Sequence, residues 1–287
     1  MAFSISPLTN RQLYFIIYKV KISKDLETFI MLKAGLCSVT FRNKTPQEIV
    51  EISAKAGIHS IEWGSDVHVP AGDVNIAREV KKMTEDAGLE VSSYGSYFRL
   101  GTGTDIVPFL ESAKALGTDE IRVWAGGSPS AYLLPDAREA LILEAKEISR
   151  KAAEYGITIS TECHAHTITD FPESQLFYML EVNEPNFRTY WQALLQVPED
   201  KQMHSLRTIY ASGKLTNLHV YYFKTFATGR EQLLLSEATD IWAERFSVFK
   251  GDDTVRHAML EFVRGGSDES FIADAKTLVE LINQANA

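Results

Sequence analysis

Short apolar segments alternate with amphipathic segments along most of the chain, and this alternation restricts the fold more than any other feature. Four helical patterns, at residues 46–57, 75–88, 105–117 and 135–156, each end in glycine, which helix C-termini favour. Strands alternating with helices over about 250 residues predict a single-domain α/β fold, the (β/α)8 or TIM barrel. The eight predicted strands span residues 34–40, 58–63, 89–94, 119–124, 157–162, 186–191, 216–222 and 257–263.

A doubly wound parallel sheet is the alternative fold for the same alternation. That fold usually carries a glycine-rich phosphate loop after its first strand, and the segment SVTFRNKTP, residues 38–46, contains no glycine. The chain also lacks a linker, a low-complexity segment and a strong charge run. The sequence therefore favours one barrel, whose active site lies at the carboxyl ends of the strands.

The composition argues against nucleic-acid and membrane partners. The 287 residues carry a formal net charge of −9 without a block of Lys or Arg, whereas phosphodiester backbones attract basic surfaces. An acidic protein can still bind a small anion through one or two local cations. The two cysteines, Cys37 and Cys163, form no CxxC pair, which favours buried, reduced thiols in a cytoplasmic protein.

The N-terminal segment is interpreted separately from the barrel. Its apolar patch, residues 13–18, is too short to cross a bilayer, and no small-residue cleavage site follows it. Met31 then opens a new strand-like run. We interpret residues 1–30 as an N-terminal extension and residues 31–287 as the barrel. The alternative is a short ordered appendage packed on the barrel exterior.

Three ionisable residues lie within or at the ends of otherwise apolar strands. Glu162 ends the fifth predicted strand, His219 lies in the seventh, and Glu261 lies in the eighth. A charged group in a buried strand is costly unless it is paired or binds a metal. Because the carboxyl ends of barrel strands meet at one face, these residues predict one convergent site.

Two carboxylates and an imidazole suit a divalent cation such as Mn²⁺, Mg²⁺, Co²⁺ or Zn²⁺. Such an ion can hold adjacent hydroxyl and carbonyl oxygens of a sugar and stabilise an enediolate. Glu162 and Glu261, on opposite faces of that sugar, could then exchange a proton with the carbon beside the carbonyl. The alternative is that both glutamates only cap neighbouring backbone groups.

A series of segments gives most of the chain a family resemblance. In order, they are IEWGSDVHVPAGD, SSYGSYFRLG, IRVWAG, TECHAHTITD, FRTYWQ, NLHVYYF and LEFVRGGSDESFIADAKTL. Through them, residues 31–287 resemble the xylose-isomerase-like TIM-barrel superfamily of sugar phosphate isomerases and epimerases. Members of that superfamily isomerise, epimerise, dehydrate or cleave different compounds, so the resemblance implies no particular substrate.

The resemblance also implies a metal site, since these enzymes usually bind one divalent ion through Glu, Asp, His and Glu on strands five to eight. Glu162 falls on the first ligand position, His219 on the third and Glu261 on the fourth. The second position should be an Asp, but the chain reads NFRTYWQALL there, and Gln192 is the nearest oxygen ligand. An amide in place of a carboxylate removes one negative charge, so metal affinity should fall or selectivity should change.

Five further residues are candidates for contacts with substrate. His68 matches a loop histidine that such enzymes often aim at the substrate, and His164 is placed to bind a hydroxyl or orient the ligand. Arg99 and Arg230 could clamp a phosphate or carboxylate. Trp124 could form the floor of a sugar pocket. The alternatives are structural histidines, solvated arginines and a tryptophan packed in the core.

These observations lead to a first hypothesis of a metal-dependent sugar or sugar-phosphate isomerase or epimerase that uses Glu162 and Glu261 as its acid–base pair. A lyase that expels water from a polyol ketone, as an inosose dehydratase does, would use the same metal and base. A sugar-binding barrel with a degraded metal site is the non-catalytic alternative, which the missing strand-six Asp motivates. A phosphodiesterase would need more histidine ligands and a basic face. Barrels of this kind commonly associate, so a homo-oligomer is compatible with the sequence.

Overall fold

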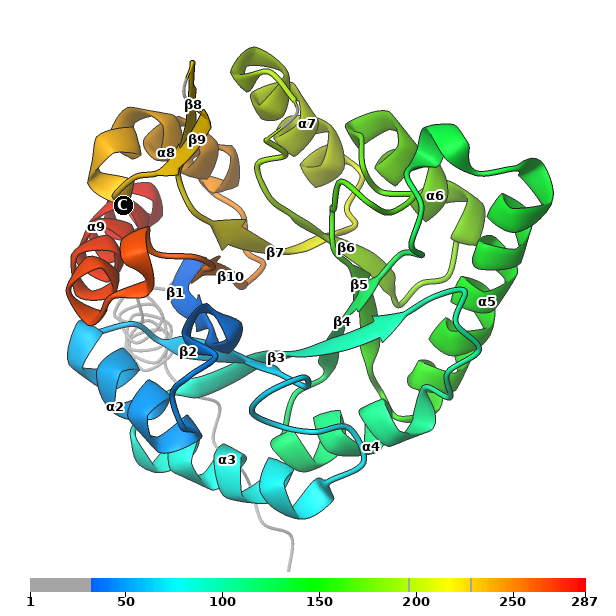
Figure 1. The fold of residues 1–287 in the computed structure, drawn as a ribbon, viewed down its shortest axis with the longest axis horizontal. Helices are drawn as coiled ribbons and strands as arrows, with labels where there is room; N and C mark the ends of the chain where they lie inside the picture. Colours follow the sequence, from blue (N-terminus) through cyan, green and yellow to red (C-terminus); the bar gives the residue numbers. More distant parts are fainter. Residues whose placement is uncertain (1–31, 196, 228) are drawn as a thin grey trace, which may run out of the picture.

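Eight parallel strands close into a barrel at the centre of the molecule (Figure 1). The computed structural model describes residues 32–195, 197–227 and 229–287. Neighbouring strands pair in the order β1-β10-β7-β6-β5-β4-β3-β2, so the predicted TIM barrel is confirmed and the doubly wound sheet is excluded. The strands are β1 (Leu32–Cys37), β2 (Ser60–Gly64), β3 (Glu90–Arg99), β4 (Glu120–Trp124), β5 (Thr158–Thr161), β6 (Phe187–Trp191), β7 (Leu215–Val220) and β10 (Arg256–Leu260).

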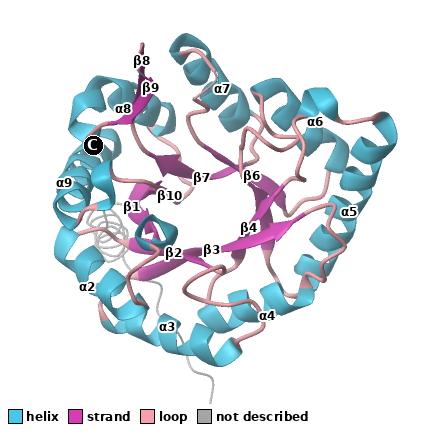
Figure 2. Cartoon of the chain, viewed as in Figure 1, coloured by secondary structure: helices cyan, strands magenta, loops and turns pink. Residues whose placement is uncertain are grey.

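Helices form an outer layer around the barrel, as Figure 2 shows. Glycine or asparagine in the left-handed conformation ends several of them, as the glycine pattern of the sequence predicts. The α-helices of the described residues are α2 (Pro46–Ala56), α3 (Val74–Asp86), α4 (Val107–Leu116), α5 (Pro135–Glu154), α6 (Pro172–Val182), α7 (Glu199–Ala211), α8 (Thr239–Phe246) and α9 (Asp268–Asn286).

Helix α2 illustrates how local sequence sets these boundaries. The Thr45 side chain accepts a hydrogen bond from the Glu48 backbone N–H, and the Glu48 carboxylate accepts one from Thr45 N, which together form a capping box. Pro46 fits the first helical position because it needs no hydrogen-bond partner there. Gly57 ends the helix at a positive φ of 71°.

The strands differ from their predicted ranges mainly at their carboxyl ends. Residues 38–41 form a 3-10 turn after β1, and residues 221–222 and 261–263 lie beyond β7 and β10. Strand β3, in contrast, continues to Arg99 through a register shift against β4. Glu261, predicted within the eighth strand, directly follows that strand. An antiparallel hairpin that the sequence analysis did not predict, β8 (Phe223–Phe226) and β9 (Gly229–Gln232), follows β7.

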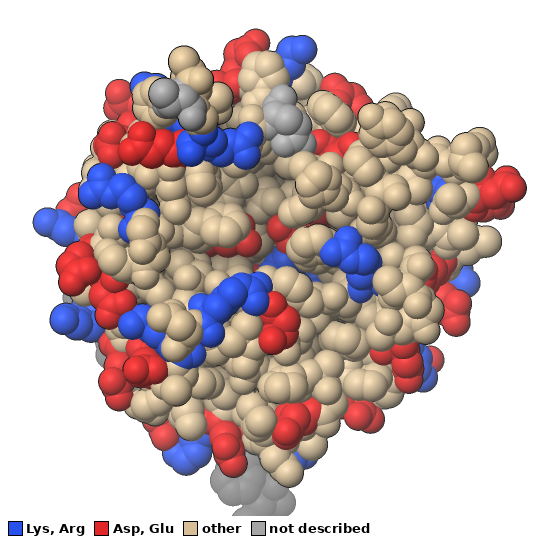
Figure 3. All heavy atoms as spheres, viewed as in Figure 1, with Lys and Arg blue, Asp and Glu red and all other residues tan. Residues whose placement is uncertain are grey.

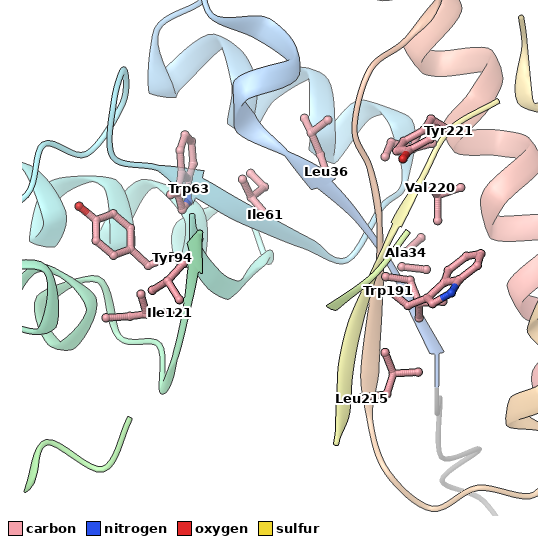
Figure 4. Packing of buried hydrophobic residues seen from close by; sticks show 14 of the residues in the cluster. Ala34, Leu36, Ile61, Trp63, Tyr94, Ile121, Trp191, Leu215, Val220 and Tyr221 are labelled. Carbon is pink, nitrogen blue, oxygen red and sulfur yellow. The ribbon is translucent and has the colours of Figure 1, made fainter. Parts of the chain in front are cut away.

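The apolar side chains of the strands pack outward against the helices. Ile61 and Trp63 alternate with Glu62 along β2, and each is fully buried. Figure 4 shows Ile61, Trp63, Ile121 and other apolar side chains of this layer. Because strand side chains alternate between two faces, the polar residues at the intervening positions must occupy the barrel interior.

Toward the amino-terminal ends of the strands, the lower part of the barrel interior, hydrogen bonds satisfy these inward-facing polar side chains. Asn217 Nδ2 on β7 donates to Glu120 Oε2 on β4 over 2.8 Å, and Ser160 Oγ donates to Glu120 Oε1 over 2.5 Å. Ser60 Oγ lies 2.8 Å from His257 Nδ1. Most TIM barrels fill this space with branched apolar residues. Here the filling is a buried polar network, which requires every member to find a partner.

Residues 1–30, the predicted extension, lie outside the described residues, so that interpretation stays a prediction. Within residues 32–195, 197–227 and 229–287, no helix has the length and apolar character needed to cross a membrane.

Replacing Glu120 with Gln should reduce the sensitivity of stability to pH. Burial raises the pKa of Glu120 to about 7, so the folded protein retains a proton that the unfolded chain releases above its ordinary value of 4.5. Stability from this group therefore falls as pH rises from about 4.5 to about 7, by about 3 kcal/mol, and is constant above. Urea unfolding of wild type and Glu120→Gln at about pH 5 and about pH 8 measures the difference. Equal losses in both proteins would contradict the assignment.

Candidate active site

The four predicted metal ligands converge at the carboxyl ends of their strands. Glu162, Gln192 and Glu261 directly follow β5, β6 and β10, and His219 is the penultimate residue of β7. Three of the four, Glu162, Gln192 and Glu261, line a cavity of about 510 Å³ at the mouth of the barrel. Figure 3 shows this hollow at the centre of the face, with acidic and basic atoms inside it.

The donor atoms of these residues lie close enough to share one ion. Ligand atoms of Glu162, His219 and Glu261 all lie within 4.8 Å of one another. The amide of Gln192 donates from Nε2 to the Cys163 carbonyl over 2.5 Å, which turns its Oε1 toward His219 Nδ1, 2.9 Å away. Gln192 therefore presents an oxygen where the family resemblance leads one to expect an aspartate.

Two charged residues that the sequence analysis did not select complete this cluster. Arg122 on β4 is fully buried, donates from Nε to Glu62 Oε1 over 2.9 Å, and forms a close ion pair through Nη1 with Glu162. Gly95 on β3 makes room for them, because a Cβ there would lie 2.9 Å from Arg122 Nη2 and 3.0 Å from Glu62 Oε1. Each is a charged residue inside an apolar strand, in SIEWG and EIRVW, so the signal used for Glu162 was present for both.

The imidazole of His219 is oriented by carboxylates on both sides. Its Nε2 lies 3.6 Å from Glu62 Oε1, and its Nδ1 lies 3.2 Å from Glu261 Oε2. Burial, the largest single influence, opposes protonation of His219, but the interactions of the ring with Glu261 and Cys37 together outweigh it and raise the pKa of His219. Burial likewise disfavours ionised Glu261, yet His219 holds the pKa of Glu261 below its usual value. A histidine whose second nitrogen faces a carboxylate is the usual arrangement of a metal-binding imidazole.

The residues present fit a divalent cation. A metal-binding imidazole must give up the proton that Glu261 favours in the metal-free site. With His219 in that neutral form, the buried side chains of Glu62, Arg122, Glu162 and Glu261 leave two negative charges uncompensated, and a divalent ion would neutralise them. Carboxylate, amide and imidazole donors suit Mg²⁺, Mn²⁺, Co²⁺ or Zn²⁺. The structure thus supplies candidate ligands without deciding which metal they bind.

A second group of possible metal ligands, which shares His219 with the first, is unsuited to a cation. Ligand atoms of Cys37, Glu62 and His219 also lie within 4.8 Å of one another. Burial raises the pKa of the Cys37 thiol to about 12, so it stays protonated and donates to Glu62 Oε1 over 2.9 Å. Arg122 Nε contacts the same oxygen, so a cation there would meet a guanidinium.

Of the residues predicted to contact substrate, three line the cavity and Arg99 lies behind its wall. Trp124 and His164 line the cavity and stack on each other, with ring centroids 4.5 Å apart. Arg230, on β9 of the hairpin, also lines the cavity. Arg99 stacks on Trp124, its guanidinium carbon 3.9 Å from the ring centroid, and donates to the Gly126 carbonyl. Arg99 therefore supports the wall instead of lining it.

His68 lies outside the cavity. It is buried behind the loop after β2, where Nδ1 lies 3.0 Å from Ser38 Oγ and Nε2 lies 3.2 Å from the Lys44 carbonyl. Both ring nitrogens are thus engaged within the chain, and burial lowers the pKa of His68. This placement matches the structural alternative, so we assign no substrate contact to His68.

Comparison with known proteins places the chain beside enzymes of two kinds. No family model matches it. The 3-dehydroshikimate dehydratase of Bacillus anthracis is 24% identical over 168 residues, which cover 55% of this chain and 60% of that enzyme, so the match spans less than two thirds of the relative. The solved structure of the probable 3-DHS dehydratase AsbF from Bacillus anthracis superposes with a TM-score of 0.72 at 20% identity, over 86% of this chain and 98% of that one. D-allulose 3-epimerase from Methylomonas sp. gives 0.67 at 18% identity, over 89% and 98%.

The structural neighbours are xylose-isomerase-like TIM barrels. This confirms the resemblance on which the sequence analysis relied, at the level of the fold. The neighbours include epimerases and a dehydratase, so the fold alone does not select between isomerase and lyase chemistry.

Replacing Gln192 with Asp should tighten binding of Mn²⁺ by roughly tenfold or more, because the added carboxylate supplies a charged donor to the ion. Asn at the same position is the matched control, since it shortens the side chain equally but stays neutral. Calorimetric titration of metal-free protein measures the affinity. Equal affinities for the Asp and Asn variants would remove residue 192 from the set of ligands.

Proposed function

We propose that this protein is a metal-dependent lyase that removes a proton beside the carbonyl of a small polyhydroxylated substrate and expels water. Glu162, Gln192, His219 and Glu261 would hold the ion. Bound there, a divalent cation would polarise the carbonyl oxygen of the substrate. The proposal retains the metal chemistry inferred from the sequence but favours the lyase alternative over the isomerase.

The observation that carries this preference is that both glutamates predicted as the acid–base pair already have partners within the chain. Arg122 pairs with Glu162, and Gln192 Nε2 lies 3.3 Å from the other Glu162 oxygen. Glu261 is held by His219. Both carboxylates are thus already paired within the chain, which makes a two-carboxylate relay unfavourable. An epimerase must move protons on two faces of its substrate, whereas an elimination needs one base.

His164 is the group best placed to act as that base. It lines the cavity, stacks on Trp124, and uses Nδ1 to accept a weak hydrogen bond from His166 N over 3.3 Å. Its Nε2 has no partner among the described residues. In the neutral ring, Nδ1 accepts this hydrogen bond and Nε2 carries the proton. For either nitrogen to take a proton from the substrate, the contact between Nδ1 and His166 N must weaken as the substrate binds. The B. anthracis relative, a dehydratase by name, supports the same reaction class.

Epimerisation is the second candidate function. Glu162 and Glu261 both line the cavity, and a barrel of the same fold is D-allulose 3-epimerase. If a substrate hydroxyl displaced Arg122 from Glu162, that carboxylate would be free to exchange a proton. The two reactions give different products, so one experiment separates them.

Incubation with Mn²⁺ and two substrates in deuterated water tests the reaction class. We expect 3-dehydroshikimate to lose water and give an aromatic dihydroxybenzoate, which ultraviolet absorbance detects. We expect D-allulose to gain no carbon-bound deuterium by proton NMR. Deuterium in D-allulose without any dehydration of 3-dehydroshikimate would favour the epimerase instead.

Replacing His164 with Gln should lower kcat by about 10²- to 10⁴-fold, the usual contribution of general acid–base catalysis. His166→Gln is the matched control, because His166 lines the same cavity, with its ring 5.7 Å from that of His164. Steady-state kinetics of both variants provide the measurement. A loss of less than fivefold in His164→Gln would remove His164 from the base role.

A further inference from the structure

Three residues other than glycine adopt a positive φ within the described part of the chain: Tyr97 at 54°, Asn183 at 49° and Phe262 at 61°. Asn183 ends helix α6, where asparagine is a common left-handed cap. The other two are bulky aromatic residues, for which this conformation is a genuine outlier. Both line the cavity at the barrel mouth.

A bulge in β3 places Tyr97 at the cavity. Gly95 pairs with Arg122 and Arg99 pairs with Trp124, so three residues of β3 lie opposite a single residue of β4. Such bulges next to active sites re-aim a side chain. The backbone strain at Tyr97 is therefore the local cost of turning its ring toward the cavity.

The phenol of Tyr97 is flanked by guanidinium groups. Arg42 Nη2 donates to the phenol oxygen over 2.7 Å, and its guanidinium carbon lies 5.5 Å from the ring centroid. The Arg122 guanidinium carbon lies 5.7 Å from the same centroid. Desolvation raises the pKa of Tyr97, so the hydroxyl keeps its proton. Among the residues that the structure describes, none accepts that proton, and it is free for a ligand.

Phe262 directly follows the proposed ligand Glu261 and leaves 48% of its surface exposed at the cavity. Its ring packs edge-on against Tyr221 and Phe223, at centroid distances of 5.7 Å and 5.9 Å. An exposed aromatic ring in a strained backbone conformation contributes little as a core residue. It is suited to cover the apolar face of a bound ring.

We propose that Tyr97 and Phe262 are specificity-determining residues that clamp a cyclic hydroxylated substrate. Phe262 packs against a C–H face of the substrate ring, and Tyr97 donates its hydroxyl proton to a substrate oxygen. This inference rests on the proposed function and deepens it, because it selects ring-shaped substrates over open-chain sugars.

Two variants test the clamp against the possibility of ordinary packing. Tyr97→Phe keeps the ring and removes the hydroxyl, and we expect kcat/KM for 3-dehydroshikimate to fall at least tenfold with the melting temperature unchanged. Phe262→Gly removes the ring and relieves the backbone, and we expect KM to rise at least fivefold with a melting temperature no lower than that of wild type. Asn183→Gly, the matched control at a positive φ far from the cavity, should leave the kinetics unchanged.

The outcomes separate the clamp from the proposed function. Wild-type turnover of 3-dehydroshikimate with unchanged kinetics in Tyr97→Phe and Phe262→Gly would overturn the clamp and leave the lyase intact. A wild type that converts neither 3-dehydroshikimate nor D-allulose would contradict the proposed function. That result would overturn the clamp as well, because the clamp rests on the proposed function. A melting temperature of Phe262→Gly below that of wild type would also overturn it, because the ring is then a packing residue.

Discussion

The ion pairs that Arg122 makes with Glu62 and Glu162 are the interaction on which the rest of the site depends. The guanidinium is fully buried, and it separates two carboxylates that would otherwise repel each other in the barrel interior. Removing one partner of such a cluster typically costs about 3–5 kcal/mol. Glu62, fixed by Arg122, faces Nε2 of His219 and leaves Nδ1 toward Glu261. One buried cation thus orders the carboxylates and, through Glu62, the proposed metal ligand.

The fold followed from the sequence because its signals are local. Apolar strand segments, glycine at helix ends and the capping box at Thr45 each act within a few residues, and together they predicted the barrel. The convergence of Glu162, His219 and Glu261 followed from barrel geometry. The contacts of Arg122 did not, because they join β2, β4 and β5 across the interior, and no sequence pattern states which inward residues meet. Burial of His68 and the left-handed backbone of Tyr97 depend on tertiary packing in the same way.

The barrel interior divides into two polar layers with different consequences. In the lower layer, Glu120 is held by Ser160 and Asn217, and its raised pKa links stability to pH. In the upper layer, despite burial, Arg122 lowers the pKa of Glu62 and His219 lowers the pKa of Glu261, which suits cation binding. Aromatic side chains line the cavity above this layer, and two of them, Tyr97 and Phe262, have a strained backbone. The barrel interior thus holds the charged groups, and the aromatic residues at the barrel mouth shape the cavity.

The most direct measurement is a crystal structure of the protein soaked in Mn²⁺, with anomalous scattering used to locate the ion. We expect one strong anomalous peak among Glu162, Gln192 Oε1, His219 Nδ1 and Glu261, with Arg122 still paired to Glu62. A site that stays free of Mn²⁺ while Arg122 and His219 retain both glutamates would contradict a metal-dependent centre. A peak at Cys37 and Glu62 instead would contradict the assignment of the ligands.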